Sequence, residues 1–376
     1  MAVVIFKAIE KCNSNCIYCD VIKKGQDEIM NYELLKLIFI RMNDYLLEYP
    51  NENITFTWHG GEVCLLGPEY FRIAIQFQDE YCSQTKSRID HQVQSNLTLI
   101  DQEIIDLFKK LGIRQIGSSF EPIPNIRGFG KKRDSYKYNQ KFFEGIKLLN
   151  ENHMTWGVIY VVHKLSLKMP LEIFYYLTNL NIRSHPNFNQ VKIFGEDNNN
   201  LAISGEEFAD FLGAIFPVWY KNKDRYPNVQ PFSRLCKNII EKDLSLVCES
   251  SGLCSFKWIY IGPDGETSQC GRAGDYNILS FGNLKDYTFE EIMNNPMRNQ
   301  LAERQDFLPH NECEDCRFWG ICHGGCPLDA YMTYHDFQRK SPSCEATKIF
   351  LERYFEPITG IQVNFKPIRT AINMMN

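Results

Sequence analysis

The chain has 376 residues, of which 44% are hydrophobic and 23% are charged, an ordinary composition for a globular protein. Its 41 basic and 46 acidic residues give a formal net charge of −5 without a basic stripe, which argues against nucleic-acid binding. No apolar run reaches the roughly 18 residues of a membrane-spanning helix, and no signal peptide is evident. We therefore expect a cytoplasmic protein that binds neither nucleic acid nor membrane.

Strand-like and helix-like segments alternate over the first half of the chain. The expected strands are 3–7, 53–58, 90–95, 113–117, 154–162 and 189–194, and the expected helices are 31–49, 68–84, 101–111, 137–151 and 170–180. This alternation predicts βαβ units and a parallel sheet. Six strands are too few to close an eight-stranded barrel, so we predict an α/β fold with a partial (β/α)6 barrel of TIM type. The chemistry of such folds lies at the carboxyl ends of the strands.

Three cysteines follow the first expected strand within eight residues: Cys12, Cys16 and Cys19. Closely spaced thiolates of this kind hold iron–sulfur clusters. A 4Fe–4S cluster needs four ligands and this stretch supplies three, which would leave one iron open to a ligand that is not protein. Zinc is the alternative, but a zinc site closes a tetrahedron with further ligands, and Asp20 is the only nearby candidate.

The pattern Cys12-x3-Cys16-x-Tyr18-Cys19 resembles the signature of radical S-adenosylmethionine (SAM) enzymes, with Tyr18 in the aromatic position. The resemblance implies that SAM chelates the open iron through its amino and carboxylate groups. One electron then cleaves SAM to a 5′-deoxyadenosyl radical, which abstracts hydrogen from an unactivated carbon. The same resemblance implies an external electron donor such as flavodoxin or ferredoxin.

Two segments at the ends of the second and third strands resemble further SAM-binding motifs of this family. Gly60-Gly61-Glu62 resembles the motif that binds the methionine amino group. Glycines let a ligand approach the backbone, and a carboxylate can hold an ammonium group. Ser95 and Asn96 resemble the polar segment that contacts the ribose.

The resemblance also implies SAM-binding residues after the fourth and sixth strands. Ser119 and Arg127 would contact the methionine carboxylate and the ribose, because arginine pairs with carboxylates in a bidentate manner. Ile193 or Phe194, at the end of the sixth strand, would lie against the adenine.

Eight of the 14 cysteines lie between Cys248 and Cys344. Thiols of a large cytoplasmic protein stay reduced, so clustered cysteines are more often metal ligands than disulfides. Around them the sequence predicts a hairpin with a Pro-Asp-Gly turn, a helix over 288–304 and a last helix that begins at Cys344. The remaining cysteines, Cys64, Cys82 and Cys236, are expected to be buried apolar groups.

The C-terminal spacing resembles the SPASM domain, which follows radical SAM barrels and carries two auxiliary 4Fe–4S clusters. The resemblance assigns Cys248, Cys254, Cys270 and Cys326 to the first cluster, and Cys313, Cys316, Cys322 and Cys344 to the second. A zinc ribbon is the alternative for paired cysteines. With four cysteines on each cluster no iron stays open, which favours electron transfer. We predict a radical SAM barrel over 1–235 and a SPASM domain over 236–376.

SPASM enzymes mostly modify peptides or proteins, so the resemblance implies a peptide or protein substrate. Anaerobic sulfatase maturases, which oxidise Cys or Ser to formylglycine, share this length and these spacings. They carry an Asp base directly after the hairpin cysteine, where this chain has Gly271, and a Gln where it has His59. Asp275 is the candidate substitute base. We predict instead a maturase that installs a thioether, ether or carbon–carbon cross-link in a ribosomally made peptide.

Two further expectations concern substrate recruitment and a third class of function. The stretch before Cys12 has no room for the N-terminal peptide-recognition domain of many such maturases. The substrate would then be held by the barrel and SPASM surfaces, or by a separate recognition protein. A non-catalytic iron–sulfur electron carrier is the third hypothesis, and the three-ligand first site argues against it because a carrier has no use for an open iron.

Overall fold

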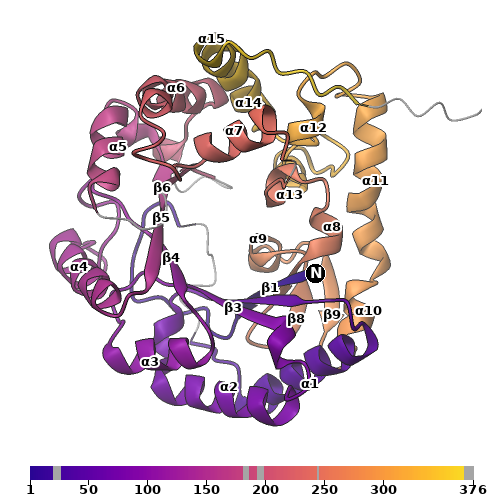
Figure 1. Cartoon of the computed structure of the whole chain (residues 1–376). Coiled ribbons are helices and arrows are strands. Elements are labelled where there is room, and N and C mark those ends of the chain that lie inside the picture. The colour runs from indigo at the N-terminus through magenta and orange to yellow at the C-terminus, as the bar shows by residue number, and fades with distance from the viewer. Residues whose placement is uncertain (20–26, 181–185, 193–198, 244, 368–376) are drawn as a thin grey trace, which may run out of the picture. The chain divides into compact units, whose positions relative to one another are not determined.

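The computed structural model describes residues 1–19, 27–180, 186–192, 199–243 and 245–367 (Figure 1). The chain forms two compact units, and each unit is made of several separate stretches of the sequence. Unit 1 comprises 1–203, 227–230 and 256–298, and unit 2 comprises 204–226, 231–255 and 299–376. The predicted domain limits of 1–235 and 236–376 stay a prediction.

Unit 1 is built on one nine-stranded sheet. Its strands are β1 Ala2–Lys7, β2 Ile54–His59, β3 Ile89–Gln94, β4 Gln115–Ser119, β5 Thr155–Val162, β6 Pro186–Gln190, β7 Trp258–Ile261, β8 Glu266–Ser268 and β9 Ser280–Asn283. Their order is β6-β5-β4-β3-β2-β1-β7-β8-β9. Strands β1 to β6 are parallel neighbours in chain order, which confirms the predicted α/β fold. Strand β7 extends the sheet beside β1, and the predicted hairpin pairs it antiparallel with β8.

Helices connect the parallel strands of unit 1 and lie along the outer side of the sheet (Figure 1). They are α1 Tyr32–Glu48, α2 Gly67–Tyr81, α3 Gln102–Lys110, α4 Ser135–Glu151 and α5 Pro170–Thr178. Two further helices of unit 1, α9 Gly271–Asp275 and α10 Phe289–Met293, follow β8 and β9. Side chains that accept a backbone N–H fix three of the starts: Asn31 for α1, Asp101 for α3 and Asp134 for α4. Such caps satisfy N–H groups that the first turn of a helix leaves unpaired.

Two strands are displaced from their predicted positions for local reasons. Strand β4 begins at Gln115 rather than 113, because the Ile113 N–H bonds back to the Phe108 carbonyl and so belongs to the end of α3. Strand β6 begins at Pro186, at the edge of the sheet, where a residue without an N–H is tolerated. Ile193 and Phe194, predicted to end this strand, lie outside the described residues.

The single helix predicted over 288–304 is wrong. Helix α10 ends at Met293, and a separate helix, α11 Asn299–Phe307, follows after a short 3₁₀ turn at Pro296–Arg298. Proline has no N–H to donate and disfavours helical geometry in the residue before it, so Pro296 ends the first helix.

Unit 2 is helical and has an aromatic core of its own. Its helices are α6 Gly205–Lys221, α7 Phe232–Ile240, α11 Asn299–Phe307, α12 Trp319–Cys322, α13 Pro327–Tyr334, α14 Cys344–Phe350, a π-helical turn at Leu351–Phe355 and α15 Glu356–Thr359; α8 Cys254–Lys257 begins in unit 2 and ends in unit 1. Helix α14 begins at the predicted cysteine. In the core, the ring centroid of Phe216 lies 5.4 Å from those of Phe232 and Phe350.

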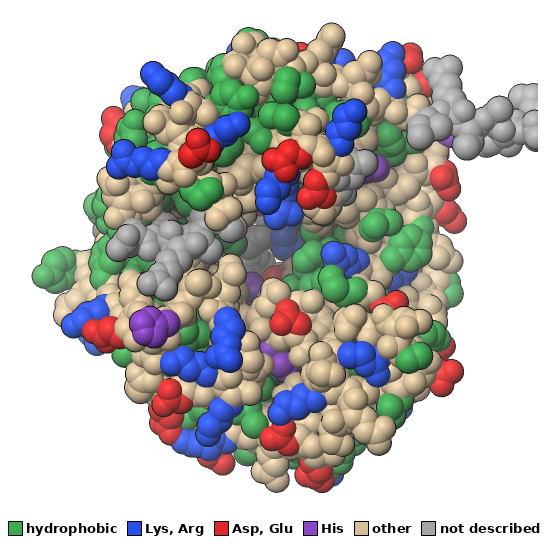
Figure 2. Space-filling view, in the orientation of Figure 1, with side chains coloured by type: hydrophobic (Ala, Val, Ile, Leu, Met, Phe, Trp, Pro, Cys, Tyr) green, Lys and Arg blue, Asp and Glu red, His purple; other side chains and the backbone are tan. Residues whose placement is uncertain are grey.

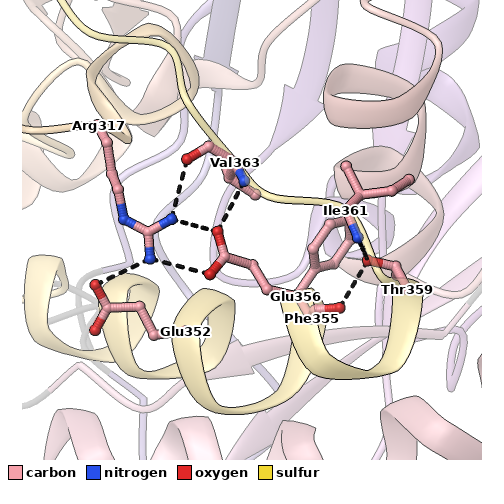
Figure 3. Close-up of polar contacts among 7 residues, drawn as sticks. All are labelled: Arg317, Glu352, Phe355, Glu356, Thr359, Ile361 and Val363. Carbon is pink, nitrogen blue, oxygen red and sulfur yellow. Dashed lines mark hydrogen bonds and ion pairs between the residues drawn. The ribbon is translucent and has the colours of Figure 1, made fainter.

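The segment after α15 is fastened to unit 2 by one arginine (Figure 3). Arg317 pairs with Glu352 at 3.3 Å and with Glu356 at 3.0 Å, and it donates to the Val363 carbonyl at 3.1 Å. The Phe365 N–H donates to the Arg317 carbonyl at 2.7 Å. The C-terminal segment therefore lies along the stretch that carries Cys313, Cys316 and Cys322, three cysteines of the second predicted auxiliary set.

The exterior of the protein carries no dominant charge on the face drawn in Figure 2, where Lys and Arg side chains are interspersed with Asp and Glu. Across the described part of the chain, no helix combines the length and the apolar character needed to cross a membrane.

Candidate active site

The loop that leaves β1 carries Cys12, Cys16 and Cys19, as predicted, and it is held by the backbone of residues 126–128. The Asn15 N–H donates to the Gly128 carbonyl at 2.8 Å, and the Ile17 N–H donates to the Ile126 carbonyl at 2.9 Å. We call residues 8–19 the cluster loop. It begins at the carboxyl end of β1, where the fold places chemistry.

The three thiols of the cluster loop crowd one another electrostatically. The pKa of Cys12 is raised to about 11, mainly by burial and also by the nearby Glu62, Cys16 and Cys19. Three thiolates can therefore coexist here only if a positive group compensates their charge. Iron bound to the sulfurs would supply that charge, because metal ligation requires and stabilises the thiolate form. The donor set fits the three-cysteine cluster that the sequence predicts.

The two glycines after β2 are required by the cluster loop itself. The Gly61 N–H donates to the Ile9 carbonyl at 3.2 Å, and the Glu62 N–H donates to the Lys11 carbonyl at 2.9 Å. A Cβ on Gly60 or on Gly61 would collide with the carbonyl oxygens of this loop. The pair thus lets the end of β2 lie directly against the segment that leads into Cys12.

Glu62 is buried and joins the ends of β2 and β3. Its carboxylate accepts from the Cys64 N–H at 3.0 Å, the Ser95 hydroxyl at 2.8 Å and the Asn96 N–H at 2.7 Å. Burial raises its pKa, although these three bonds oppose the shift. The predicted contact of Glu62 with the SAM amino group stays a prediction, and in the structure this carboxylate already organises the site.

The side-chain amide of Asn96 is hydrogen-bonded to protein groups through both its nitrogen and its oxygen. It donates to Asn13 Oδ1 at 2.7 Å and to Ser14 Oγ at 3.1 Å, and it accepts two bonds from Thr98. Asn96 therefore fastens the cluster loop to the end of β3, and Asn13, Ser14 and Thr98 are site residues that the sequence alone did not single out. A ribose contact of Ser95 and Asn96 stays a prediction.

The structure brings Tyr18, Ser119 and Arg127 together. The Arg127 guanidinium donates to the Tyr18 hydroxyl at 2.6 Å, the Tyr138 hydroxyl at 2.8 Å and the Ser119 carbonyl at 2.7 Å. Its Nε is buried without a hydrogen-bond partner. Arg127 thus connects the aromatic residue of the cysteine motif to the end of β4.

A buried pair that sequence reasoning missed lies at the ends of β4 and β5. His163 Nε2 lies 3.4 Å from Glu121 Oε2, both side chains are fully buried, and the imidazole stacks against the Tyr18 ring. These two atoms have no hydrogen-bond partner, nor have the hydroxyls of Ser118 and Tyr160. Buried polar groups in proteins are almost always satisfied. Because these atoms have almost no exposed surface, the Glu121–His163 pair packs against Tyr18 in the interior and does not border an open ligand site. The only sequence cue was their position directly after expected strands.

Asp275, the predicted substitute base, is part of a buried charge network. Lys7 Nζ lies 2.6 Å from Asp275 Oδ1 and 3.4 Å from Glu10 Oε2, and the Tyr260 hydroxyl donates to Glu10 at 2.9 Å. At Gly271 an added Cβ would lie 3.8 Å from Lys7 Cε, an ordinary contact, so the position has room for a side chain. The network accounts for the burial of Asp275 without a catalytic role.

The second predicted set of auxiliary cysteines lies within unit 2. The pKa of Cys322 is raised to about 12, mainly by burial and also by the nearby thiols of Cys344, Cys313 and Cys316. The Cys316 N–H also donates to the Cys313 carbonyl at 3.1 Å. This arrangement fits a cluster held by four thiolates.

The first predicted set is distributed differently. Cys248, Cys254 and Cys326 belong to unit 2, whereas Cys270 caps the start of α9 in unit 1. Within the described ranges, no three Cys, His, Asp or Glu side chains converge on a point that would hold a single metal ion. The ligands of a 4Fe–4S cluster each bind a different iron and lie farther apart. The assignment of this set stays a prediction.

The leftover cysteines behave as expected. Cys64, Cys82 and Cys236 are buried, and burial raises the pKa of each thiol. A neutral thiol in an apolar setting is a poor ligand and a poor nucleophile. These three cysteines are therefore core residues.

Comparison with known families identifies the class of protein. The radical SAM superfamily model matches residues 7–176, and the model of the iron–sulfur cluster-binding SPASM domain matches residues 253–317. The chain belongs to the radical SAM superfamily and carries a SPASM domain. It is thus an enzyme whose cofactors are SAM and 4Fe–4S clusters. One of these clusters binds SAM, and the others are the auxiliary clusters of the SPASM domain.

Three relatives place the chain more narrowly. The cysteine-type anaerobic sulfatase-maturating enzyme of Clostridium novyi is 22% identical over 377 aligned residues, covering 96% of this chain and 97% of the relative. The structure of native anSMEcpe with bound AdoMet and a peptide has a TM-score of 0.82 at 21% identity, over 96% and 98% of the chains. Streptococcus suis SuiB bound to the precursor peptide SuiA has a TM-score of 0.59 at 15% identity, over 91% and 74%. At these identities the solved structures establish the common fold.

Proposed function

We propose that this enzyme oxidises a residue of a ribosomally made peptide and installs a thioether, ether or carbon–carbon cross-link. The observation that carries the proposal is the missing base. Formylglycine formation needs a group within hydrogen-bond reach to take the thiol or hydroxyl proton. Gly271, at the position of the maturase Asp, has no side chain, and Asp275 is buried in an ion pair with Lys7.

Solved structures of related enzymes with bound peptides support a peptide substrate. The structures of anSMEcpe and of SuiB each contain a bound peptide. We extend this to the present chain as part of the proposal. An external electron donor such as flavodoxin or ferredoxin, and a separate recognition protein, belong to the same proposal.

In this proposal the cluster loop and its supports bind and orient the cofactor. Cys12, Cys16 and Cys19 hold the first cluster, Glu62 fixes the ends of β2 and β3, and Arg127 fixes Tyr18. Bound SAM and its cluster would supply a radical that removes a hydrogen atom from an unactivated carbon of the peptide. The protein's part is to hold the peptide in place and to keep water away from the reacting carbon.

After the hydrogen atom leaves, the substrate radical must lose one electron and one proton as the new bond forms. The eight auxiliary cysteines would hold two clusters without an open iron, which would supply an acceptor for that electron without binding the peptide. The net change is the loss of two hydrogens from the peptide.

Mass spectrometry of the product tests the proposal. A sulfatase-type Cys or Ser peptide should yield no aldehyde in the presence of a carbonyl-trapping reagent. The enzyme's own precursor peptide should become lighter by two hydrogens and should resist thiol reductants. A trapped aldehyde from the sulfatase-type peptide would overturn the proposal.

Sulfatase maturation is the second candidate, favoured by the full-length similarity to the Clostridium novyi enzyme and by the TM-score of 0.82 with anSMEcpe. If it is correct, wild type forms formylglycine and Asp275→Asn abolishes the aldehyde. The Gly271→Asp variant tests the base position directly, since that position accepts a side chain. Its matched control is Gly271→Asn, which has the same shape without the carboxylate.

A further inference from the structure

Arg304, in α11, is a fully buried arginine for which no carboxylate partner exists among the described residues. Four of its N–H groups donate to backbone carbonyl oxygens: Phe337 at 2.8 Å, His323 at 3.1 Å, Gly324 at 2.7 Å and Arg339 at 2.9 Å. A guanidinium stays protonated in proteins, and a buried charge is rarely left without an opposite one. The countercharge of Arg304 must therefore come from another kind of group.

The cysteine thiolates that would hold the auxiliary clusters fit this countercharge. The His323 and Gly324 carbonyls that accept from Arg304 lie between Cys322 and Cys326 in the chain. Burial lowers the pKa of Arg304, and the nearby Cys326, Cys313, Cys322 and Cys254, all in unit 2, oppose that shift. Cys313 and Cys322 belong to the second predicted cluster, whereas Cys254 and Cys326 belong to the first. One buried cation thus acts on ligands of both auxiliary clusters.

The backbone between the two ligand sets is shaped around this guanidinium. The residues 323–325, which separate Cys322 from Cys326, all have positive φ angles. An added Cβ on Gly324 would lie 2.3 Å from Leu308 Cδ1 and 3.1 Å from both Nη atoms of Arg304. A glycine at this position lets the turn pack closely against Leu308 and the guanidinium.

We propose that Arg304 is the fixed positive charge that raises the reduction potentials of the auxiliary clusters. Net charge and hydrogen bonding near a cluster set its potential. A cluster with four thiolates is anionic, and reduction adds one more negative charge, which a buried cation stabilises. The clusters then accept an electron from a substrate radical more readily. Arg304 acts through the clusters, so it is a positioning residue, and its role rests on the cluster assignment rather than on which bond the enzyme forms.

An EPR-monitored redox titration of the full chain tests this role. A parent carrying Cys12→Ala, Cys16→Ala and Cys19→Ala retains only the auxiliary clusters. Adding Arg304→Gln should lower their midpoint potentials by at least a tenfold change in the reduction equilibrium, which is 59 mV for one electron. Arg339→Gln is the matched control. It removes a charge from a residue whose backbone carbonyl accepts from Arg304, but its side chain is 46% exposed and pairs with Glu312, so no shift is expected.

Arg304→Lys separates the charge from the carbonyl contacts, because lysine keeps the charge and loses the fork of donors. Its potentials should stay near those of the parent. The proposal is overturned if a loaded Arg304→Gln keeps the parent's potentials, or if Arg304→Lys shifts as far as Arg304→Gln. If the Arg304→Gln variant binds no iron, the midpoint potentials of the Arg304→Lys variant decide. If neither variant binds iron, Arg304 has a structural role only. A parent without about eight iron per chain would instead refute the ligand assignment, and the proposal with it.

Discussion

Lys7 ends an apolar strand, and its burial explains the two carboxylates that surround it. Asp275 and Glu10 both contact its ammonium group, and Tyr260 donates to Glu10. Removing one partner of a buried pair leaves an uncompensated charge, which costs much more than an exposed pair contributes. We interpret Asp275 as the residue that fastens α9 to the end of β1.

Asp275→Asn should therefore destabilise the protein by roughly 3 kcal/mol, because Lys7 loses its nearer anion. Urea unfolding of the loaded protein measures the change. Asp286→Asn, at an exposed position of the same unit, should change stability little. A variant as stable as wild type but unable to convert peptide would instead identify Asp275 as the base.

The free energy of unfolding should depend on pH through the buried side chain of His91. It is buried between Trp58, whose indole N–H donates to Nδ1 at 3.1 Å, and Gln78, which bonds Nε2 at 2.6 Å. Burial lowers its pKa to about 3, below the roughly 6.5 of an unfolded chain. The unfolded state therefore takes up the proton first as the pH falls. The stabilisation is complete above about pH 6.5 and is lost progressively towards pH 3.

Between pH 7 and pH 5 this single site should lower the free energy of unfolding by about 2 kcal/mol. His91→Gln removes the titrating group, so the free energy of unfolding of this variant should fall by about 2 kcal/mol less than that of wild type between pH 7 and pH 5. Urea unfolding of both proteins at the two pH values gives the difference. Equal pH dependence in the two proteins would show that His91 is not the group responsible.

The residues of the site differ in how far the sequence could reveal them. The cysteines are readable because ligand chemistry imposes their spacing. The sequence could not reveal the roles of Lys7, Glu121 and His163, since a charged residue at a strand end looks like an ordinary surface residue until the fold buries it. The ribose contact of Asn96 stays a prediction, but the hydrogen bonds of its amide to Asn13 and Ser14 depend on how the cluster loop folds, which no local sequence pattern records.

Among the elements, the C-terminal segment has a definite mechanical role. Arg317, which follows Cys316 directly, donates to the Val363 carbonyl of this segment and to Glu352 and Glu356 of the helical turns before it. The loop of the second auxiliary cluster is thus held on one side by this arginine. Loss of these charge-assisted bonds, worth about 1.5–3 kcal/mol each, should let the loop open more often.

Arg317→Gln should therefore release iron from the second auxiliary cluster roughly tenfold faster or more, by the energy of one such bond. Release to a chelator, followed by absorbance, measures the rate. Arg353→Gln is the control, since Arg353 forms comparable ion pairs with Glu206 and Asp210 on α6. Equal rates for the two variants would remove the proposed role of the segment.

The elements themselves were predictable where one local rule dominated. Buried parallel strands such as β1 and β5 read as apolar runs, and caps such as Asn31 mark helix starts. The prediction failed at Pro296, where a helical pattern continues across a residue that cannot continue a helix, and at β4, where α3 extends its last turn through Ile113.

For the whole molecule, sequence order predicted the order of β1 to β6, because βαβ connections place successive strands side by side. It did not predict that β7 would pair with β1 and so extend the same sheet. Pairing between distant strands depends on which edge is free in the folded sheet, and no local pattern records that. For the same reason the compact units interleave along the chain instead of following one cut.

Release of 5′-deoxyadenosine tests the central claim most directly. Reconstituted protein mixed with reductant and SAM should produce it, and the variant with Cys12, Cys16 and Cys19 replaced by Ala should not. Cys236→Ala, which changes a buried core cysteine, is the matched control and should leave cleavage largely intact. Release by the triple variant, or none from a wild type loaded with about twelve iron per chain, would contradict the assignment of the cluster loop.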